Sequence, residues 1–300
     1  MKKLFLLIII LPNLIIGQIK STVIDTITQS TIPFVNIWVK DEYTGTTSNQ
    51  LGQFELPKTK NKTIVLSAIG YETKEITSNS VPNKIYLIPK ITELEEILLI
   101  QKKGIKEISI NKFEKTDLNS SFACGKEPWM NAKFFPYKDN YKNTPFLKAI
   151  KVFTISKIKN AKFIIRLYLK NEKGEIGDYL YNENIFGIAE KGKKFTEIDI
   201  SNLNIQFPKD GVFVAIEWLI VNENEYVYST KRKSKNKYIK VSDTLYQPNI
   251  ATTLKDTSEN NWTYTKGQWK KMWKYSGDKN TLKKYRNKYP LIAMELKLSN

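Results

Sequence analysis

Apolar and polar residues alternate over short runs along most of the chain, and turn residues separate the runs. The first of these runs cover 19–24, 33–39, 53–56, 63–68, 72–77 and 84–87. Short alternating runs at close spacing are typical of an all-β sandwich rather than of helices. Residues 18–101 therefore predict a small β-sandwich, with 94–100 as a further edge strand. Gly70 lies between two runs and predicts either a backbone with positive φ or a close approach of another segment.

A second series of runs follows a polar stretch at 102–120. These runs cover 145–158, 162–169, 179–188, 195–200, 212–221, 226–229 and 289–298. We expect a second, larger β-sandwich over 121–300, with a jelly roll as its simplest form. The stretch 102–120 is expected to be a linker with one short helix. The predicted fold class is all-β throughout.

The first 17 residues have the pattern of a secretory signal peptide. Lys2 and Lys3 precede an apolar run over 4–11, and Gly17 is a small residue after which a signal peptidase could cut. A membrane-spanning helix needs about 20 apolar residues, and neither this run nor any later one is that long. The predicted product begins at Gln18, carries no transmembrane segment, and is periplasmic, outer-membrane-associated or secreted.

Five spaced motifs in residues 18–101 resemble the carboxypeptidase-like regulatory domain. The motifs are Val-Ile-Asp at 23–25, Pro-Phe-Val-Asn-Ile at 33–37, Gly-Thr-Thr-Ser-Asn at 45–49, Gly-Gln-Phe at 52–54 and Ser-Ala-Ile-Gly-Tyr at 67–71. The sequences at 84–87 and 94–97 resemble the way in which this domain ends in envelope proteins of Gram-negative bacteria. The resemblance implies a transthyretin-like β-sandwich without catalytic residues of its own. The order of runs in 121–300 is similar, less specifically, to the C-terminal region of exported proteins with the same first domain, and implies no activity.

Composition excludes several kinds of catalytic site. The chain has no histidine and a single cysteine, Cys124, so it has no Ser-His-Asp or Cys-His pair, no His-ligated zinc and no internal disulfide. It also lacks the common nucleotide-binding, zinc-protease and serine-hydrolase motifs. We therefore expect no metal, no cofactor and no enzyme activity, and only chemistry based on carboxylates alone stays open. Cys124 is expected to be a small buried residue, with an intermolecular disulfide or a reactive thiol near Lys126 as alternatives.

The positive charge is confined to the second part of the chain. Residues 18–101 carry 8 lysines against 9 acidic residues, whereas residues 102–300 carry 38 basic against 21 acidic residues. Such an imbalance points to an anionic partner. Only Arg166, Arg232 and Arg286 are arginines, although the guanidinium fork is the preferred group for specific phosphate and base recognition. Together with export, this disfavours nucleic acid and favours an anionic or neutral envelope glycan or an outer-membrane protein.

Two lysine-rich segments near the C-terminus also contain aromatic residues. Residues 231–240 hold six basic residues and no acid, and residues 266–288 hold nine basic residues against Asp278. Aromatic rings interleaved with lysines could form a stacking platform with a cationic groove for single-stranded nucleic acid or an anionic glycan, and export favours the glycan or a lipid headgroup. The candidate ligand-binding residues are Trp262, Trp269, Lys270, Lys271, Trp273 and Tyr275. The alternative is a long solvated loop whose tryptophans fold back onto the sandwich.

Arg166 and Glu217 are charged residues inside otherwise apolar runs. By period-2 alternation Arg166 shares a face with Ile164 and Tyr168, so a buried ion pair with Glu217 forms if the two strands are neighbours. We favour a structural ion pair between Arg166 and Glu217 over a pair that binds a ligand, or over a Glu217 carboxylate that acts as an acid or base. A glycosidase pair of Glu217 with Glu223 or Glu225 would need a separation that the sequence does not fix.

These observations predict a non-enzymatic, exported, envelope-associated binding or scaffolding protein. One alternative is a carbohydrate-binding or polysaccharide-processing protein that uses the aromatic and lysine-rich C-terminal segment. A further alternative is an accessory partner of an outer-membrane TonB-dependent receptor.

Overall fold

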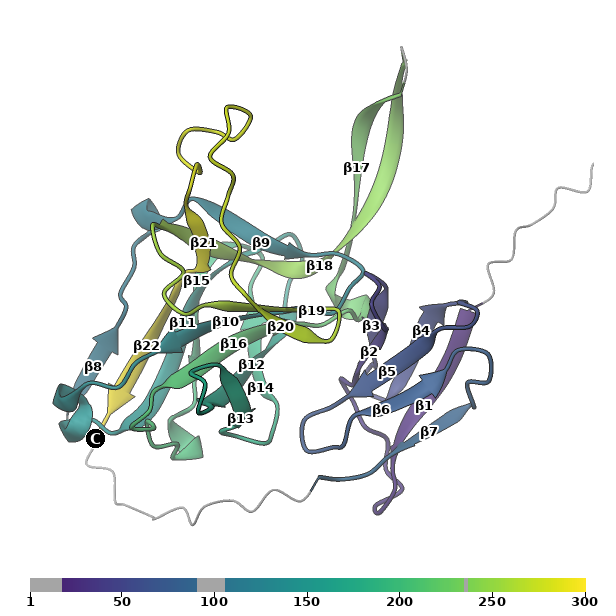
Figure 1. Cartoon of the computed structure of the whole chain (residues 1–300), viewed down its shortest axis with the longest axis horizontal. Helices are drawn as coiled ribbons and strands as arrows, with labels where there is room; N and C mark the ends of the chain where they lie inside the picture. The colour runs from purple at the N-terminus through teal and green to yellow at the C-terminus, as the bar shows by residue number, and fades with distance from the viewer. Residues whose placement is uncertain (1–17, 91–105, 235–236) are drawn as a thin grey trace, which may run out of the picture.

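The computed structural model describes residues 18–90, 106–234 and 237–300, and it forms two β-sandwiches that lie against each other (Figure 1). The predicted signal peptide and the predicted edge strand over 94–100 lie outside the described residues. Within the described ranges the structure contains no helix long and apolar enough to span a membrane.

Seven strands of the described residues form the N-terminal sandwich. One sheet has the order β4-β1-β7 and contains β1 (Gln18–Asp25), β4 (Gln53–Pro57) and β7 (Lys84–Leu87). The other has the order β3-β2-β5-β6 and contains β2 (Asn36–Val39), β3 (Gly45–Thr47), β5 (Thr63–Ser67) and β6 (Lys74–Thr77). Strand β1 is antiparallel to β4 and parallel to β7. This arrangement confirms the predicted N-terminal β-sandwich.

Alternate residues of these strands build the core between the two sheets. Phe54 and Leu56 of β4 and Ile85 and Leu87 of β7 are buried, while the residues between them are exposed. Burial of each such side chain contributes about 1.5–3 kcal/mol by removing apolar surface from water. Gly70 has a φ of 77°, which is the first of the two expected alternatives.

The C-terminal sandwich packs a seven-stranded sheet on an eight-stranded sheet. The first has the path β13-β12-β16-β10-β19-β20, with β14 also paired to β12. Its strands are β10 (Met130–Phe135), β12 (Ala161–Lys170), β13 (Ile176–Tyr179), β14 (Ile185–Ala189), β16 (Val212–Trp218), β19 (Trp262–Thr265) and β20 (Gln268–Lys271). The predicted run over 179–188 is thus divided between β13 and β14.

The second sheet has the path β17-β18-β11-β22-β8, and β9, β15 and β21 pair with its members. Its strands are β8 (Glu107–Ile110), β9 (Ser120–Cys124), β11 (Phe146–Ser156), β15 (Gly192–Asp199), β17 (Glu225–Ser234), β18 (Lys237–Lys255), β21 (Tyr289–Ile292) and β22 (Met294–Ser299). Short 3-10 turns η1 (Lys115–Asp117), η2 (Asp139–Asn143), η3 (Ser201–Leu203) and η4 (Asn222–Asn224) lie between strands.

The two faces of the seven-stranded sheet have different roles. Phe163, Ile165 and Leu167 of β12 point into the core between the C-terminal sheets. The residues that alternate with them, among them Arg166 and Tyr168, are also buried but belong to the opposite face. Phe34 and Asn36 of the N-terminal sandwich contact Ile164 and Glu217 on that outer face, so this part of it forms the surface between the two domains.

The predicted linker over 102–120 needs correction. Strand β8 pairs antiparallel with β22 of the C-terminal sandwich, and Phe113 is buried against Phe153, Ala251 and Ala293. The described part of this stretch is therefore built into the second domain. In β8 only Ile108 and Ile110 follow the alternating pattern, and both are half-buried. So short an alternation was not recognisable as a strand in the sequence.

Candidate functional site

The N-terminal sandwich docks on its neighbour through backbone as well as side-chain contacts. The Gly45 N–H donates to the Lys126 carbonyl at 3.1 Å, and the Ile220 N–H donates to the Thr47 hydroxyl at 3.1 Å. A Cβ on Gly45 would stand 2.4 Å from the Pro128 ring, so the two domains meet here at a distance that only glycine permits.

A hairpin of the C-terminal domain makes a second contact. Strands β19 and β20 are joined by a tight turn in which Gly267 has a φ of 77° and lies against the Trp38 indole. The Tyr264 ring meets Trp38 edge-on at 6.2 Å, and Lys266 Nζ lies 3.7 Å from the centre of the Tyr43 ring. Aromatic and cation–π contacts thus hold the hairpin to the N-terminal sheet.

A buried ion pair stands at the centre of this interface. Arg166 Nε lies 2.5 Å from Glu217 Oε2, and their side chains are 3% and 2% exposed. The two residues are diagonal neighbours, because Arg166 is paired with Ala215 and Glu217 with Ile164. The structure therefore brings together the two charged residues that the sequence placed inside apolar runs.

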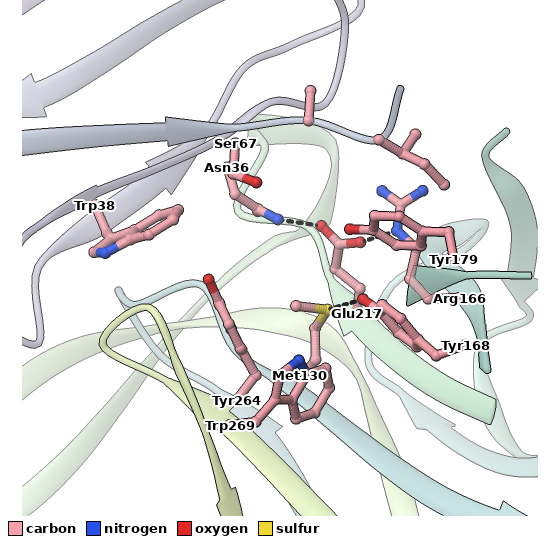
Figure 2. A pocket seen from close by; sticks show the side chains of 12 residues that line it. Asn36, Trp38, Ser67, Met130, Arg166, Tyr168, Tyr179, Glu217, Tyr264 and Trp269 are labelled. Carbon is pink, nitrogen blue, oxygen red and sulfur yellow. Dashed lines mark hydrogen bonds and ion pairs between the residues drawn. The ribbon is translucent and has the colours of Figure 1, made fainter. Parts of the chain in front are cut away.

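The remaining partners of the pair come from both domains. Asn36 of β2 donates its side-chain amide to Glu217 Oε1 (Figure 2). Arg166 Nη1 donates to Asn184 Oδ1 at 2.6 Å. Burial by itself would lower the pKa of the Arg166 guanidinium, but the adjacent Glu217 carboxylate outweighs it and raises that pKa. Both Glu217 oxygens accept hydrogen bonds, so the N-terminal domain completes the coordination of a charge in its neighbour.

A cavity of about 90 Å³ lies beside the ion pair and is lined by both domains. Its aromatic lining consists of Trp38 from the N-terminal sheet and Tyr168, Tyr179, Tyr264 and Trp269 from the C-terminal one (Figure 2). Tyr168 stacks on Tyr179 at 4.7 Å and meets Trp269 edge-on at 5.6 Å, and Tyr264 lies 5.2 Å from Trp269. The rings form a continuous wall rather than separate surface positions.

The polar groups in this wall are neutral or mutually neutralised. Burial raises the pKa of the Tyr168, Tyr179 and Tyr264 phenols, so they stay protonated at neutral pH. Asn36 is one of the residues that line the cavity. Its Oδ1 atom is buried and accepts no hydrogen bond from any described residue. An unpaired buried acceptor costs about 1–3 kcal/mol unless a ligand or water donates to it. The cavity can therefore receive a neutral group that donates hydrogen bonds.

The six candidate residues of the lysine-rich segment do not form one platform. Trp269 lines the cavity, and Trp262 is buried nearby with Lys271 Nζ 5.7 Å from its ring. Lys270 is exposed on the opposite side of the same hairpin strand. Two members lie elsewhere: Trp273 packs at 5.5 Å on Phe122, and Tyr275 packs at 5.2 Å on Tyr285.

Sequence reasoning missed Asn36, Trp38 and the tyrosines as parts of one site. A signal existed in Asn36, because it is a polar residue in an apolar run and β2 is buried along its whole length. Glu223 and Glu225, which could have paired with Glu217 in a glycosidase, are exposed and belong to η4 and β17, outside the cavity lining.

Cys124 is fully buried at the end of β9. Burial raises the pKa of its thiol far above the ordinary value, which keeps it protonated and poorly nucleophilic. We expect a thiol-specific reagent to leave it unmodified in the folded protein and to label it fully in urea, as measured by mass spectrometry. Rapid labelling without denaturant would contradict this placement.

The described residues contain no group of three or more His, Cys, Asp or Glu side chains that could hold a metal ion.

Comparison with known proteins bears on the first sandwich. Residues 19–99 match the family model of the CarboxypepD_reg-like domain. This match agrees with the β-sandwich of seven described strands and with the motifs in the sequence. In this chain the domain supplies Asn36 and Trp38 to the site.

Beyond this domain the comparisons give little. No curated protein matches the chain. A chain from a structure of infectious bursal disease virus, Gx strain, is 9% identical, with 94% of this chain and 60% of that chain covered and a TM-score of 0.24. The chain thus spans 60% of the length of that viral chain, and so low a score says nothing about fold or function.

Proposed function

We propose that the protein is a non-enzymatic, exported, envelope-associated binding protein, and that its CarboxypepD_reg-like domain is a fixed part of the ligand site. The observation that carries this proposal is the cavity whose lining comes from both domains, with Glu217 held between Arg166 and Asn36. Export is supported by the signal-peptide pattern and by the match to a domain of envelope proteins.

The geometry around Glu217 argues against acid/base catalysis. A general acid or base must exchange its proton with the substrate, so one carboxyl oxygen has to face it. Here Oε2 accepts from Arg166 and Oε1 accepts from Asn36, and the side chain is 2% exposed. This carboxylate stabilises the interface, and the chain has no histidine to act in its place.

The chemistry of the cavity favours a glycan as the ligand. Its volume of about 90 Å³ is below the roughly 300–1,000 Å³ of typical small-molecule pockets, so only the end of a longer ligand enters. Aromatic rings, neutral phenols and the free Asn36 acceptor suit a sugar edge with hydroxyl or amide donors. The position of Trp269 in the cavity wall therefore favours a carbohydrate as the ligand of this binding protein.

A binding panel with a matched pair of variants tests this. We expect the protein to bind one neutral or anionic envelope polysaccharide at near-physiological salt, measured by isothermal titration calorimetry. Trp269→Ala should weaken that binding at least about tenfold, the loss typical of a buried tryptophan anchor. Trp273→Ala should leave it unchanged, because Trp273 packs on Phe122 outside the cavity.

Three results would go against the proposal. Equal losses of glycan affinity in Trp269→Ala and Trp273→Ala would show that the cavity is not the binding site. Turnover of a polysaccharide that Glu217→Gln abolishes would make the protein an enzyme. Absence of any glycan binding, with stoichiometric recovery of an outer-membrane receptor from the envelope, would favour the accessory-partner alternative.

A further inference from the structure

The β17–β18 hairpin stands away from both sandwiches as a free two-stranded ribbon (Figure 1). Its strands pair antiparallel from Glu225–Tyr246 to Ser234–Lys237, which gives ten consecutive pairs. At about 3.4 Å per residue the ribbon is roughly 30 Å long. None of its described side chains over 225–231 and 238–246 is buried. An isolated two-stranded hairpin is only marginally stable in water, so we expect a ribbon of this length to be stabilised by contact with a partner.

The outer end of the ribbon is strongly basic. In the sequence, residues 231–240 contain six basic residues and no acid, and the described residues among them, 231–234 and 237–240, pair at the outer end of the hairpin. Lys231 and Lys240 are directly opposite each other and exposed, and neither has an ion-pair partner among the described residues. Opposed like charges destabilise a strand pair, so the pairing is favoured when an anionic surface neutralises them.

Apolar side chains are exposed at the same end. Tyr238 is 71% exposed and Ile239 is 48% exposed, and they are flanked by Lys237 and Lys240 in the sequence. Further along the ribbon Val227 is 57% exposed. A soluble polyanion such as a nucleic acid or an acidic polysaccharide would neutralise the lysines but leave the isoleucine in water. A lipid interface accepts both groups, because tyrosine and aliphatic side chains enter the headgroup region while lysines contact phosphates.

We propose that the β17–β18 ribbon is a docking surface for an anionic lipid bilayer, with Tyr238 and Ile239 entering the headgroup region and Lys231 and Lys240 contacting lipid phosphates. This surface is separate from the cavity between the two sandwiches. It would hold the protein at the membrane while the cavity remains accessible, and it does not depend on the function proposed for that cavity.

Vesicle flotation tests this proposal on the full protein. The probes are neutral phosphatidylcholine vesicles and vesicles that also contain phosphatidylglycerol. We expect binding to the anionic vesicles, weakened but not abolished by near-physiological salt, since the apolar contacts are not screened. Lys231→Thr/Lys233→Thr/Lys240→Thr should weaken binding at least about tenfold, because each lysine near such a surface contributes to the attraction.

Two further variants separate lipid docking from general charge attraction. Tyr238→Thr/Ile239→Thr should remove the salt-resistant part of the binding while net charge stays constant. Lys58→Thr/Lys60→Thr/Lys279→Thr removes the same charge from exposed positions elsewhere and should leave binding unchanged. An unchanged melting temperature shows that each variant is folded.

Any of three results overturns the proposal. The first is a lack of binding to anionic vesicles by the wild-type protein. The second is an equal loss in the control triple variant, which would assign the binding to overall charge. The third is binding to single-stranded DNA or heparin that is as tight as binding to vesicles and insensitive to Tyr238→Thr/Ile239→Thr, which would make the ribbon a polyanion site.

Discussion

Replacing Glu217 by alanine is expected to lower the free energy of unfolding by about 3–5 kcal/mol, the cost of leaving one partner of a buried ion pair alone. Arg166 would keep its charge at 3% exposure, with Asn184 Oδ1 as its remaining hydrogen-bond partner. Asn36 would lose the acceptor of its amide as well. Urea unfolding followed by tryptophan fluorescence measures the change, since Trp218 and Trp129 stack within the same domain.

A double variant provides the control for this prediction. In Arg166→Met/Glu217→Leu both charges are replaced by apolar groups of similar size, so most of the lost stability should return. Glu217→Gln should fall between the two, because it keeps an oxygen that can accept from Asn36 but loses the charge. A loss below about 1 kcal/mol for Glu217→Ala would indicate that water reaches the pair and that it resembles a surface salt bridge.

Gly45→Val is expected to separate the two sandwiches while each stays folded. The added side chain would collide with Pro128 and with the Ile37 carbonyl, at 2.4 and 2.6 Å from the Cβ position alone. Overpacking of this kind costs about 1–3 kcal/mol. Moving the N-terminal domain away relieves the collision with Pro128, whereas the collision with Ile37 of the paired strand β2 requires a local shift within the domain. Small-angle X-ray scattering should show a larger radius of gyration, and glycan binding at the cavity should be lost.

Gly125→Val is the matched control, because no atom lies within 4 Å of a Cβ at that position. It should leave both the scattering curve and the binding unchanged. A Gly45→Val protein as compact as the wild type would show that the contact between β3 and the loop before β10 does not fix the domains.

Alternation in the sequence predicted most of the fold but failed where buried positions are polar. Strand β10 was missed because Asn131 and Lys133 occupy buried positions, at 0% and 3% exposure, in place of apolar residues. Lys133 is accommodated by Glu259 at 3.5 Å from its Nζ, a partner 126 positions away that no local pattern reveals. Strand β18 was missed because its first residues, 237–240, belong to the lysine-rich stretch 231–240, which is typical of a solvated loop.

The site was predictable in part for a related reason. Arg166 and Glu217 stood out because charged residues in apolar strands need a partner, and period-2 alternation placed each on a defined face. The contribution of Asn36 and Trp38 was not predictable, because it depends on how one sandwich docks on the other. The lysine-rich tail was treated as one surface, whereas β-pairing sends Trp269 to the cavity and Trp273 to the side of β9.

Differential scanning calorimetry of the wild type and of Asn36→Leu tests most directly whether the two sandwiches form one body. Asn36 belongs to the N-terminal domain, but its amide donates to Glu217 in the C-terminal domain. We expect a single cooperative transition for the wild type and a shift of that whole transition to lower temperature in the variant. Two separate transitions, with only the N-terminal one shifted, would contradict it and leave the CarboxypepD_reg-like domain as an independent module.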